Sequence, residues 1–325
     1  KLTQRFLYNL YELKDEIDVF VAFETMNNRG KSLSNLELLK NRLIYLTTLY
    51  SKEEADESKQ LVVRRKIIDA WKEIYYQLGR NKNKPLNDDD FLKAHWIMYF
   101  AYSRKKANDY INNLLDERFS PRNVLEKVEM SKSTLYKVET VIEEGGDDEI
   151  NDESEENTIE ISKLPIKDIV DYVNSLKHAA NHWFNLFNPD IVSELDPDER
   201  KYLDKLNRLG LIYFRPLILS IYCNRNIKVQ ERIQFLRALE RFIFVNFRLS
   251  RAMSTYGSSY YSNSARNVYR GNTTISELIV ELENDTDWTL NDNRSYKTSH
   301  FKDYIDKRFS ADGSGFYGWS AIRYF

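Results

Sequence analysis

The sequence predicts a mainly α-helical protein, made of helical bundle regions with a small α+β remnant at the N-terminus. Only 10 glycines and 6 prolines interrupt its 325 residues, which is few for the many turns of an all-β fold. Apolar residues recur every three to four positions along most of the chain, the spacing of amphipathic helices. The exception is Val19–Phe23, a short apolar run that is typical of a buried strand.

This strand is expected between two helices. Residues 3–17 carry apolar side chains at helical spacing and predict the first helix. Ser34 and Glu37 have the spacing of a capping box, so the second helix is expected to begin there. One apolar stripe continues along it, formed by Leu36, Leu39, Leu43, Leu46 and Tyr50.

The next stretch predicts three helical segments. A helix over residues 61–79 is expected, with a core side made of Val62, Ile67 or Ile68, Trp71 and Tyr75. Asn87 is the expected cap of a helix that extends to Tyr102. Helical spacing continues over residues 107–142, where Ser120, followed by a proline, indicates a helix start.

The C-terminal half is also predicted to be helical, apart from one loop. Residues 211–222 are nearly all apolar, so we expect the buried central helix there, with a kink or a new start at Pro216. Residues 255–272 are rich in Ser, Tyr and Asn and are expected to form a mobile surface loop. The other expected helices span residues 165–187, 197–210, 228–253, 276–283 and 300–309.

An acidic run separates the expected domains. Residues 143–160 hold ten acids and no Lys or Arg, so we expect a linker. Removing these ten charges from the net charge of −2 leaves +8 for the rest, which could meet phosphate if it is clustered. The expected divisions are 1–50 as part of an α+β domain, 51–142 as a helical region, 143–160 as the linker and 161–325 as a second helical domain.

Composition indicates a cytoplasmic protein. Cys223 is the single cysteine, and a thiol that cannot pair within the chain fits a reducing compartment. No signal peptide and no apolar segment of membrane length is visible in the sequence. We therefore expect no membrane partner.

The loop before the second helix is a candidate anion site. Backbone N–H groups at a helix N-terminus are unpaired, and the helix dipole is positive there. Arg29 and Lys31 add charge, and Gly30 can adopt a left-handed conformation. Together with Asn27, these are the candidate nucleotide-binding residues. A strand–turn–helix corner with merely solvated basic residues is the alternative.

The residues around this loop match a known signature. The matching residues are Phe23, Glu24, Asn27, Arg29, Gly30, Leu33, Ser34 and Glu37–Asn41. In this spacing they resemble the signature of GmrSD-type proteins, which are modification-dependent bacterial restriction endonucleases and their relatives. Weaker similarity covers residues 239–248 and 316–325.

The resemblance implies a function in phage defence. In that family a ParB/sulfiredoxin-like N-terminal domain handles a nucleotide, and a C-terminal HNH domain cuts DNA. Residues 1–50 would be the C-terminal part of the nucleotide-handling domain, and residues 161–325 would precede the nuclease. The implied partners are DNA and a nucleotide, and the implied cofactor is an NTP with Mg²⁺.

Two family motifs are absent from the sequence. The Asp-Gly-Gln-Gln-Arg motif of the N-terminal domain does not occur, and neither does the HNH signature. We therefore expect the middle portion of a longer protein, with neither catalytic centre complete and no catalytic residue to assign. A non-enzymatic helical scaffold or interaction protein, and an NTPase with an unorthodox site, are the alternatives.

The expected helix 228–253 carries an arginine stripe. At 100° per residue, four arginines fall within about 80° of arc on the side opposite the apolar residues: Arg237, Arg241, Arg248 and Arg251. Such a stripe can bind DNA phosphates or pair with acids of neighbouring helices. We expect Arg237 and Arg241 to be structural, and Arg248 and Arg251 to reach phosphate.

One histidine pair has the spacing of metal ligands. His178 and His182 are separated by four positions, which places both on one helix face, where they could bind zinc. The sequence offers no evident third ligand, so we assign no metal site.

Overall fold

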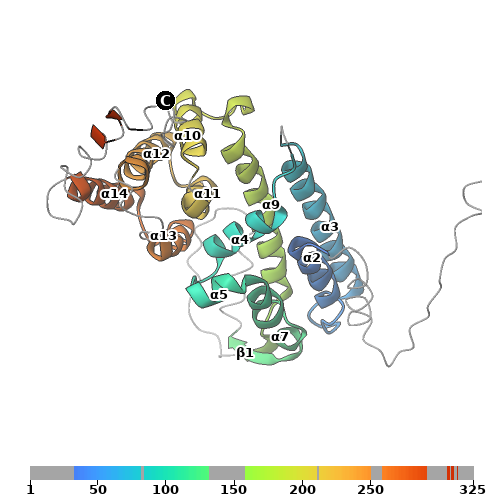
Figure 1. The fold of residues 1–325 in the computed structure, drawn as a ribbon. Helices are drawn as coiled ribbons and strands as arrows, with labels where there is room; N and C mark the ends of the chain where they lie inside the picture. Colours follow the sequence, from blue (N-terminus) through green and yellow to red (C-terminus); the bar gives the residue numbers. More distant parts are fainter. Residues whose placement is uncertain are drawn as a thin grey trace, which may run out of the picture. The chain divides into compact units, whose positions relative to one another are not determined.

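The computed structural model describes residues 33–81, 84–131, 158–210, 212–249 and 258–290, together with a few positions between 306 and 313. Within these ranges the protein is mainly helical, as predicted (Figure 1). The helix expected at residues 3–17 and the strand expected at Val19–Phe23 lie outside the described residues. The α+β remnant therefore stays a prediction.

The chain divides into two compact units. The first combines residues up to Arg64 with Leu114–Ile166, and the second combines Arg65–Asn113 with the residues from Lys167 onward. The second unit includes Arg65–Asn113 because α4 (Asp88–Tyr99) packs against helices from the C-terminal half of the chain. The domain divisions expected at residues 50, 142 and 160 stay a prediction.

The first unit contains α2 (Asn35–Leu46), the beginning of α3 (Glu57–Gly79) and α7 (Pro121–Leu125). Both hydrogen bonds of the predicted capping box are present, between Ser34 and Glu37. Ser120 caps α7, also as predicted. The predicted stripe of α2 is the buried side of this helix, and its members are Leu36, Leu39, Leu43, Leu46 and Tyr50.

A two-stranded antiparallel sheet also belongs to the first unit. β1 (Lys127–Ser131) pairs with β2 (Thr158–Ser162). The expectation of helix through residue 142 is therefore wrong over residues 127–131, and that of a linker through residue 160 is wrong over residues 158–160. The cause is a period-two alternation of polar and apolar side chains, which fits a strand better than a helix. Glu54 fixes the sheet end, since its carboxylate accepts hydrogen bonds from Lys127 Nζ and from the Ser162 backbone, both at 2.5 Å.

The second unit is helical throughout its described residues. Its longer helices are α4, α9 (Ile166–Phe187), α10 (Pro197–Leu209), α11 (Arg215–Cys223), α12 (Val229–Ile243), α13 (Ser258–Tyr269) and α14 (Ile275–Leu290). The shorter pieces are α5 (Arg104–Asn108), α6 (Tyr110–Asn112), η3 (Pro189–Ile191) and η4 (Ile212–Phe214), and the π-helix η2 (Asn113–Arg118) leads back into the first unit. In Figure 1, α12 lies beside α14, and α11 lies beside α13.

The core of the second unit surrounds α11. Every residue from Pro216 to Cys223 is buried, which confirms the predicted central helix. Pro216 stands in the first turn of α11, so it marks a new start rather than a kink. The neighbouring helices contribute fully buried aromatic side chains: Phe91, Trp96, Tyr172, Trp183, Phe184, Phe214, Phe235 and Phe242.

The loop expected over residues 255–272 is wrong, because most of it is helix α13. Tyr261, Ala265 and Val268 recur at helical spacing and are buried against the core. These three positions outweigh the Ser and Asn content of the segment, since burying one apolar stripe is enough to hold a surface helix.

The core face of α3 was predicted correctly at Ile67 and wrongly at Val62 and Tyr75. Val62 is 47% exposed and Tyr75 is 37% exposed, whereas Val63 and Ile74 are buried. Trp71 is buried, as predicted. The helix carries two apolar rows, of which only one is buried. The second row faces outward and consists of Leu61, Val62, Ile68, Tyr75 and Tyr76.

Candidate functional site

The candidate nucleotide-binding residues Asn27, Arg29, Gly30 and Lys31 lie outside the described residues, so this site stays a prediction. The helix that follows it is described: α2 begins at Asn35 behind its Ser34 cap. Its first-turn N–H groups are partly satisfied by this cap and by Glu37.

The arginine stripe is broken by a change of helix type. α12 ends at Ile243 and continues as the π-helix η5 (Phe244–Leu249). A π-helix turns less per residue than an α-helix, so side chains beyond Phe244 lag behind the rotation assumed in the sequence analysis. Arg237 and Arg241 belong to α12 and Arg248 to η5, while Arg251 lies outside the described residues.

The three described arginines have different surroundings. Arg241 Nη2 lies 3.2 Å from Asp287 Oδ1 of α14, and both side chains are about half exposed. Arg237 is exposed. Burial raises the pKa of Glu240, and the charges of Lys205 and Arg237 oppose this rise. The nearer ion pair of Glu240 is with Lys205 of α10, at 3.7 Å. Arg237 is therefore the member of the stripe most open to an external phosphate.

Arg248 completes the end of another helix. Its Nη2 atom donates a hydrogen bond to the backbone carbonyl of Leu209, the last residue of α10. Gly210 follows as a left-handed C-cap with φ of 71°. A cation at this position satisfies a free carbonyl and complements the negative end of the helix dipole. This contact gives Arg248 a structural role.

A second polar region opens on the second unit. We call it the polar pocket; it measures about 620 Å³ and lies among α3, α9, the segment after η3, α11 and α12. Its polar wall includes Gln77, Arg80, Asn181, His182, Tyr222 and Arg232. A cavity of this size falls in the range of small-molecule sites.

His182 forms part of this wall, and His178 lies beside it. His182 Nε2 lies 3.4 Å from His178 Nε2, and the rings meet edge to face with centroids 4.6 Å apart. Burial lowers the pKa of His182 to about 4, helped by the nearby His178 and Arg232. His182 is therefore neutral at pH 7. Its buried Nδ1 atom has no hydrogen-bond partner among the described residues.

An ion pair supports the opposite side of the pocket. Arg232 Nε donates to Glu199 Oε1 at 2.6 Å, and Glu199 is 1% exposed. The Arg232 guanidinium also lies 5.2 Å from the centroid of Tyr222. Burial, reinforced by the adjacent Glu199 carboxylate, raises the pKa of the Tyr222 phenol far above its usual value. Tyr222 therefore stays a neutral hydroxyl at any physiological pH.

Arg80 and Gln77 project from the end of α3. The Arg80 guanidinium stacks on the ring of Phe184, with its central carbon 3.7 Å from the ring centroid. Within the described ranges it forms no ion pair. Gln77 is 6% exposed, and its Nε2 donates to Glu73 at 2.6 Å. Its Oε1 is buried and accepts no hydrogen bond from any described residue.

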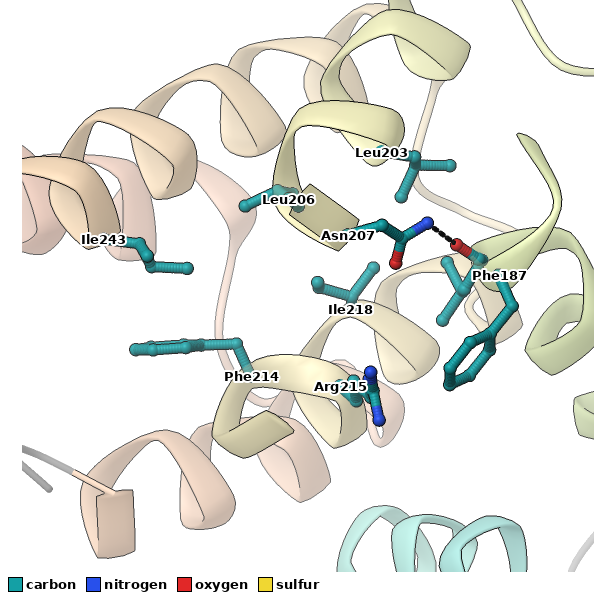
Figure 2. Close-up of a pocket in the computed structure, with 9 residues that line it drawn as sticks. Phe187, Leu203, Leu206, Asn207, Phe214, Arg215, Ile218 and Ile243 are labelled. Atoms are coloured by element: carbon teal, nitrogen blue, oxygen red, sulfur yellow. Dashed lines mark hydrogen bonds between the residues drawn. The ribbon is translucent and has the colours of Figure 1, made fainter. Parts of the chain in front are cut away.

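A smaller pocket of about 20 Å³ lies elsewhere in the same unit (Figure 2). Apolar side chains dominate its wall, among them Leu203, Phe214 and Ile218. Asn207 spans it and donates to the Leu186 carbonyl at 2.8 Å, the dashed line in Figure 2. The space is about that of a single water molecule, so we assign it no ligand.

The sequence analysis identified only part of the polar pocket. It singled out His182, but as a possible metal ligand. Gln77, Tyr222 and Arg232 lie 10 to 155 residues from one another, and no local pattern connects them. A buried polar residue within an apolar helix face, such as Gln77 on α3, was the available signal.

Comparisons with known proteins identify no relative: no protein family, no curated protein and no solved structure matches this chain. Over the described part of the chain, no three His, Cys, Asp or Glu side chains are grouped as metal ligands would be. No helix within the same residues is long and apolar enough to span a bilayer.

Proposed function

We propose that this chain is the helical portion of a nucleotide-dependent, modification-sensing DNA endonuclease of the GmrSD type. The observation that carries the proposal is the run of matching residues between Phe23 and Asn41. Twelve positions of one signature coincide there in the correct spacing, which is far more specific than a short motif.

The described end of this run supports the proposal. Leu33–Asn41 includes the Ser34 cap, Glu37 and the buried signature leucine of α2, Leu39. The signature residues at these positions therefore have a structural reason: they start the helix and fix it to the core. Asn27, Arg29, Gly30 and Lys31 would contact the nucleotide just before this helix.

The DNA-facing surface would centre on Arg237. Its side chain is exposed on α12, and Arg241 lies one turn further along the same helix. A phosphate could replace Asp287 as the partner of Arg241, because an exposed ion pair contributes only about 0–1 kcal/mol. Arg248 would support this surface through its contact with α10 rather than touch DNA.

Salt-titrated DNA binding tests this function. The 325-residue chain would be titrated onto duplex DNA, with and without modified bases, in fluorescence anisotropy. Each phosphate contact contributes about 0.9 to the slope of log affinity against log salt. We expect Arg237→Gln to lower this slope by about one. Exposed Arg65 of α3 is the control, since Arg65→Gln should leave the slope unchanged.

A non-enzymatic helical scaffold is the second candidate. The contacts of Arg241 with Asp287 and of Arg248 with Leu209 favour it, because these arginines are engaged within the chain. Absence of DNA binding at low salt would exclude the DNA-facing surface and leave the scaffold. If the Arg237→Gln variant binds DNA with the wild-type salt slope, Arg237 does not contact a DNA phosphate.

A further inference from the structure

The outward-facing apolar row of α3 forms an exposed surface in the second unit. Its members there are Ile68, Tyr75 and Tyr76, which are 38%, 37% and 60% exposed. At 100° per residue these side chains fall within about 100° of arc, so they share one side of the helix. Exposed apolar side chains that gather in this way mark an interaction surface, whereas scattered ones do not. We call this surface the α3 face.

The α3 face carries positive charge. Arg65 and Lys72 fall within the same arc as its apolar members. Arg80 extends the face beyond the end of the helix, with its guanidinium carbon 5.6 Å from the centroid of the Tyr76 ring. The acid on this side is Asp69, which pairs with Lys72 at 3.0 Å in a largely exposed ion pair. The face therefore keeps a net positive charge.

The exposed side of α14 has the opposite charge. Every charged residue of this helix is an acid: Glu277, Glu281, Glu283, Asp285 and Asp287. Val280 lies among these acids and is 53% exposed, while the opposite side of α14 packs against α12. Tyr260 of α13 is 46% exposed, and its hydroxyl donates a hydrogen bond to Glu281. We call Val280, Tyr260, Glu277, Glu281 and Glu283 the α14 face.

The two faces complement each other. Two α3 faces placed together would oppose Arg65 and Lys72 to cations of the same kind, and two α14 faces would bring acids together. Like charges of this sort disfavour both symmetric pairings. An α3 face against an α14 face instead combines apolar side chains with charges of opposite sign. Both faces are exposed within the described residues, so this match requires two molecules.

We propose that a second copy of this chain docks its α14 face on the α3 face, so that molecules associate head to tail. Such an interface is heterologous, and a dimer keeps one α3 face and one α14 face open for further copies. The contact is small, so we expect a dissociation constant of about 10–100 μM. The proposal is independent of the endonuclease proposal, since it uses neither Arg237 nor the candidate nucleotide loop.

Sedimentation velocity of the full chain tests the association, over protein concentrations from about 1 to about 300 μM. We expect the weight-average sedimentation coefficient to rise with concentration at about 50 mM salt. At about 500 mM salt the dissociation constant should increase at least tenfold, because salt screens the exposed charges of both faces.

Two variants assign the faces. Tyr76→Glu blocks the α3 face and Val280→Lys blocks the α14 face, and each variant alone should associate at least tenfold more weakly than the wild type. A mixture of the two should form a 1:1 dimer and nothing longer, because one intact face of each kind remains. Ile212→Glu is the matched control: Ile212 is also 60% exposed but lies on η4, so this variant should associate like the wild type. Circular dichroism verifies that each variant is folded.

Four results would overturn the proposal. The first is a wild-type chain that stays monomeric at about 300 μM, which would leave the α3 face to a different partner. The second is association that does not depend on salt. The third is wild-type association of either folded single variant. The fourth is a mixture of the two variants that remains monomeric, which would show that the α3 and α14 faces do not meet.

Discussion

Glu199 and Arg232 connect the first turn of α10 to the first turn of α12, with 2.6 Å between Oε1 and Nε. Glu199 also closes the capping box of α10, since its other oxygen accepts a hydrogen bond from the Asp196 backbone at 3.2 Å. One buried carboxylate thus starts a helix and pairs with the neighbouring one. Removing it leaves a largely buried guanidinium without its partner, which costs far more than the pair itself contributes.

We expect Glu199→Gln to lower the free energy of unfolding by about 2–4 kcal/mol. The charge of Arg232 loses its partner, although the glutamine can keep part of the cap. Urea unfolding measures the change. Asp287→Asn provides the control, because its ion pair with Arg241 is about half exposed and should contribute less than about 1 kcal/mol. Equal losses in the two variants would contradict the structural role of Glu199.

The second prediction concerns the hydrogen bond at the C-terminal end of α10. Arg248→Gln removes the hydrogen bond to the Leu209 carbonyl, and we expect a loss of about 1–2 kcal/mol by urea unfolding. Arg237→Gln, on the same continuous helical stretch, should change the stability by less than about 0.5 kcal/mol. A stability loss in Arg237→Gln that matches that of Arg248→Gln would show that Arg237 is also structural, as the sequence analysis expected of Arg237.

A third prediction concerns the backbone conformation of Gly210 at the same end of α10. Its φ of 71° is a conformation that side chains with a Cβ avoid, whereas a Cβ there would meet Arg248 Nη2 only at 3.6 Å, an ordinary contact. The cost of Gly210→Ala is therefore conformational, and we expect about 1 kcal/mol in thermal or urea unfolding. Gly79→Ala at the end of α3 is the control. Gly79 ends a right-handed turn in open space, so alanine should be neutral or stabilising there.

Local signals predicted most of the helical fold, and long-range contacts explain what was missed. The Ser34 cap, the buried α11 and the Pro216 start depend on neighbours within a few residues, so the sequence displays them. β1 and β2 pair across 26 intervening residues, so the short alternation in each strand does not reveal its partner. Arg248 was expected to reach phosphate, but its contact with Leu209 depends on a residue 39 positions away.

The polar pocket was missed for the same reason. Arg80, His182 and Arg232 come from three different helices, and their proximity is a property of the packed unit. The sequence shows that these residues are polar or charged, but it does not show that they lie close together. For the arginine stripe, the sequence analysis did predict an arrangement, and it assumed one uniform α-helix. The π-helix η5 changes the rotation per residue from Phe244 onward, so this arrangement does not hold for Arg248.

The next prediction concerns the reactivity of the buried cysteine. Burial raises the pKa of the Cys223 thiol to about 12, and the side chain is 8% exposed. Because the thiolate is the reactive form, Cys223 should be inert in the folded protein. A thiol reagent at pH 8 should modify less than about a tenth of the protein within minutes under native conditions, and all of it in guanidinium chloride. Rapid native labelling would show that α11 opens readily or lies less deeply buried.

The last prediction concerns the acid sensitivity that His182 contributes. Its pKa is about 4 in the folded protein, because burial and the nearby His178 and Arg232 oppose its charge, against an ordinary value of 6.5. The unfolded chain therefore binds the proton first as the pH falls. The stability that neutral His182 contributes is complete above pH 6.5 and is lost progressively between pH 6.5 and 4, by up to about 1.4 kcal/mol per pH unit.

Urea unfolding at pH 7.5, 6.0 and 5.0 measures this loss, with His182→Gln as the comparison. We expect the wild type to lose stability more steeply than the variant, so that the difference between them narrows as the pH falls. Titrating groups that do not contact residue 182, including His95 with its pKa of about 3, contribute equally to both proteins and cancel in this difference. A difference that stays constant across the three pH values would show that His182 has the same pKa in the folded and unfolded states, and would contradict its burial beside Arg232.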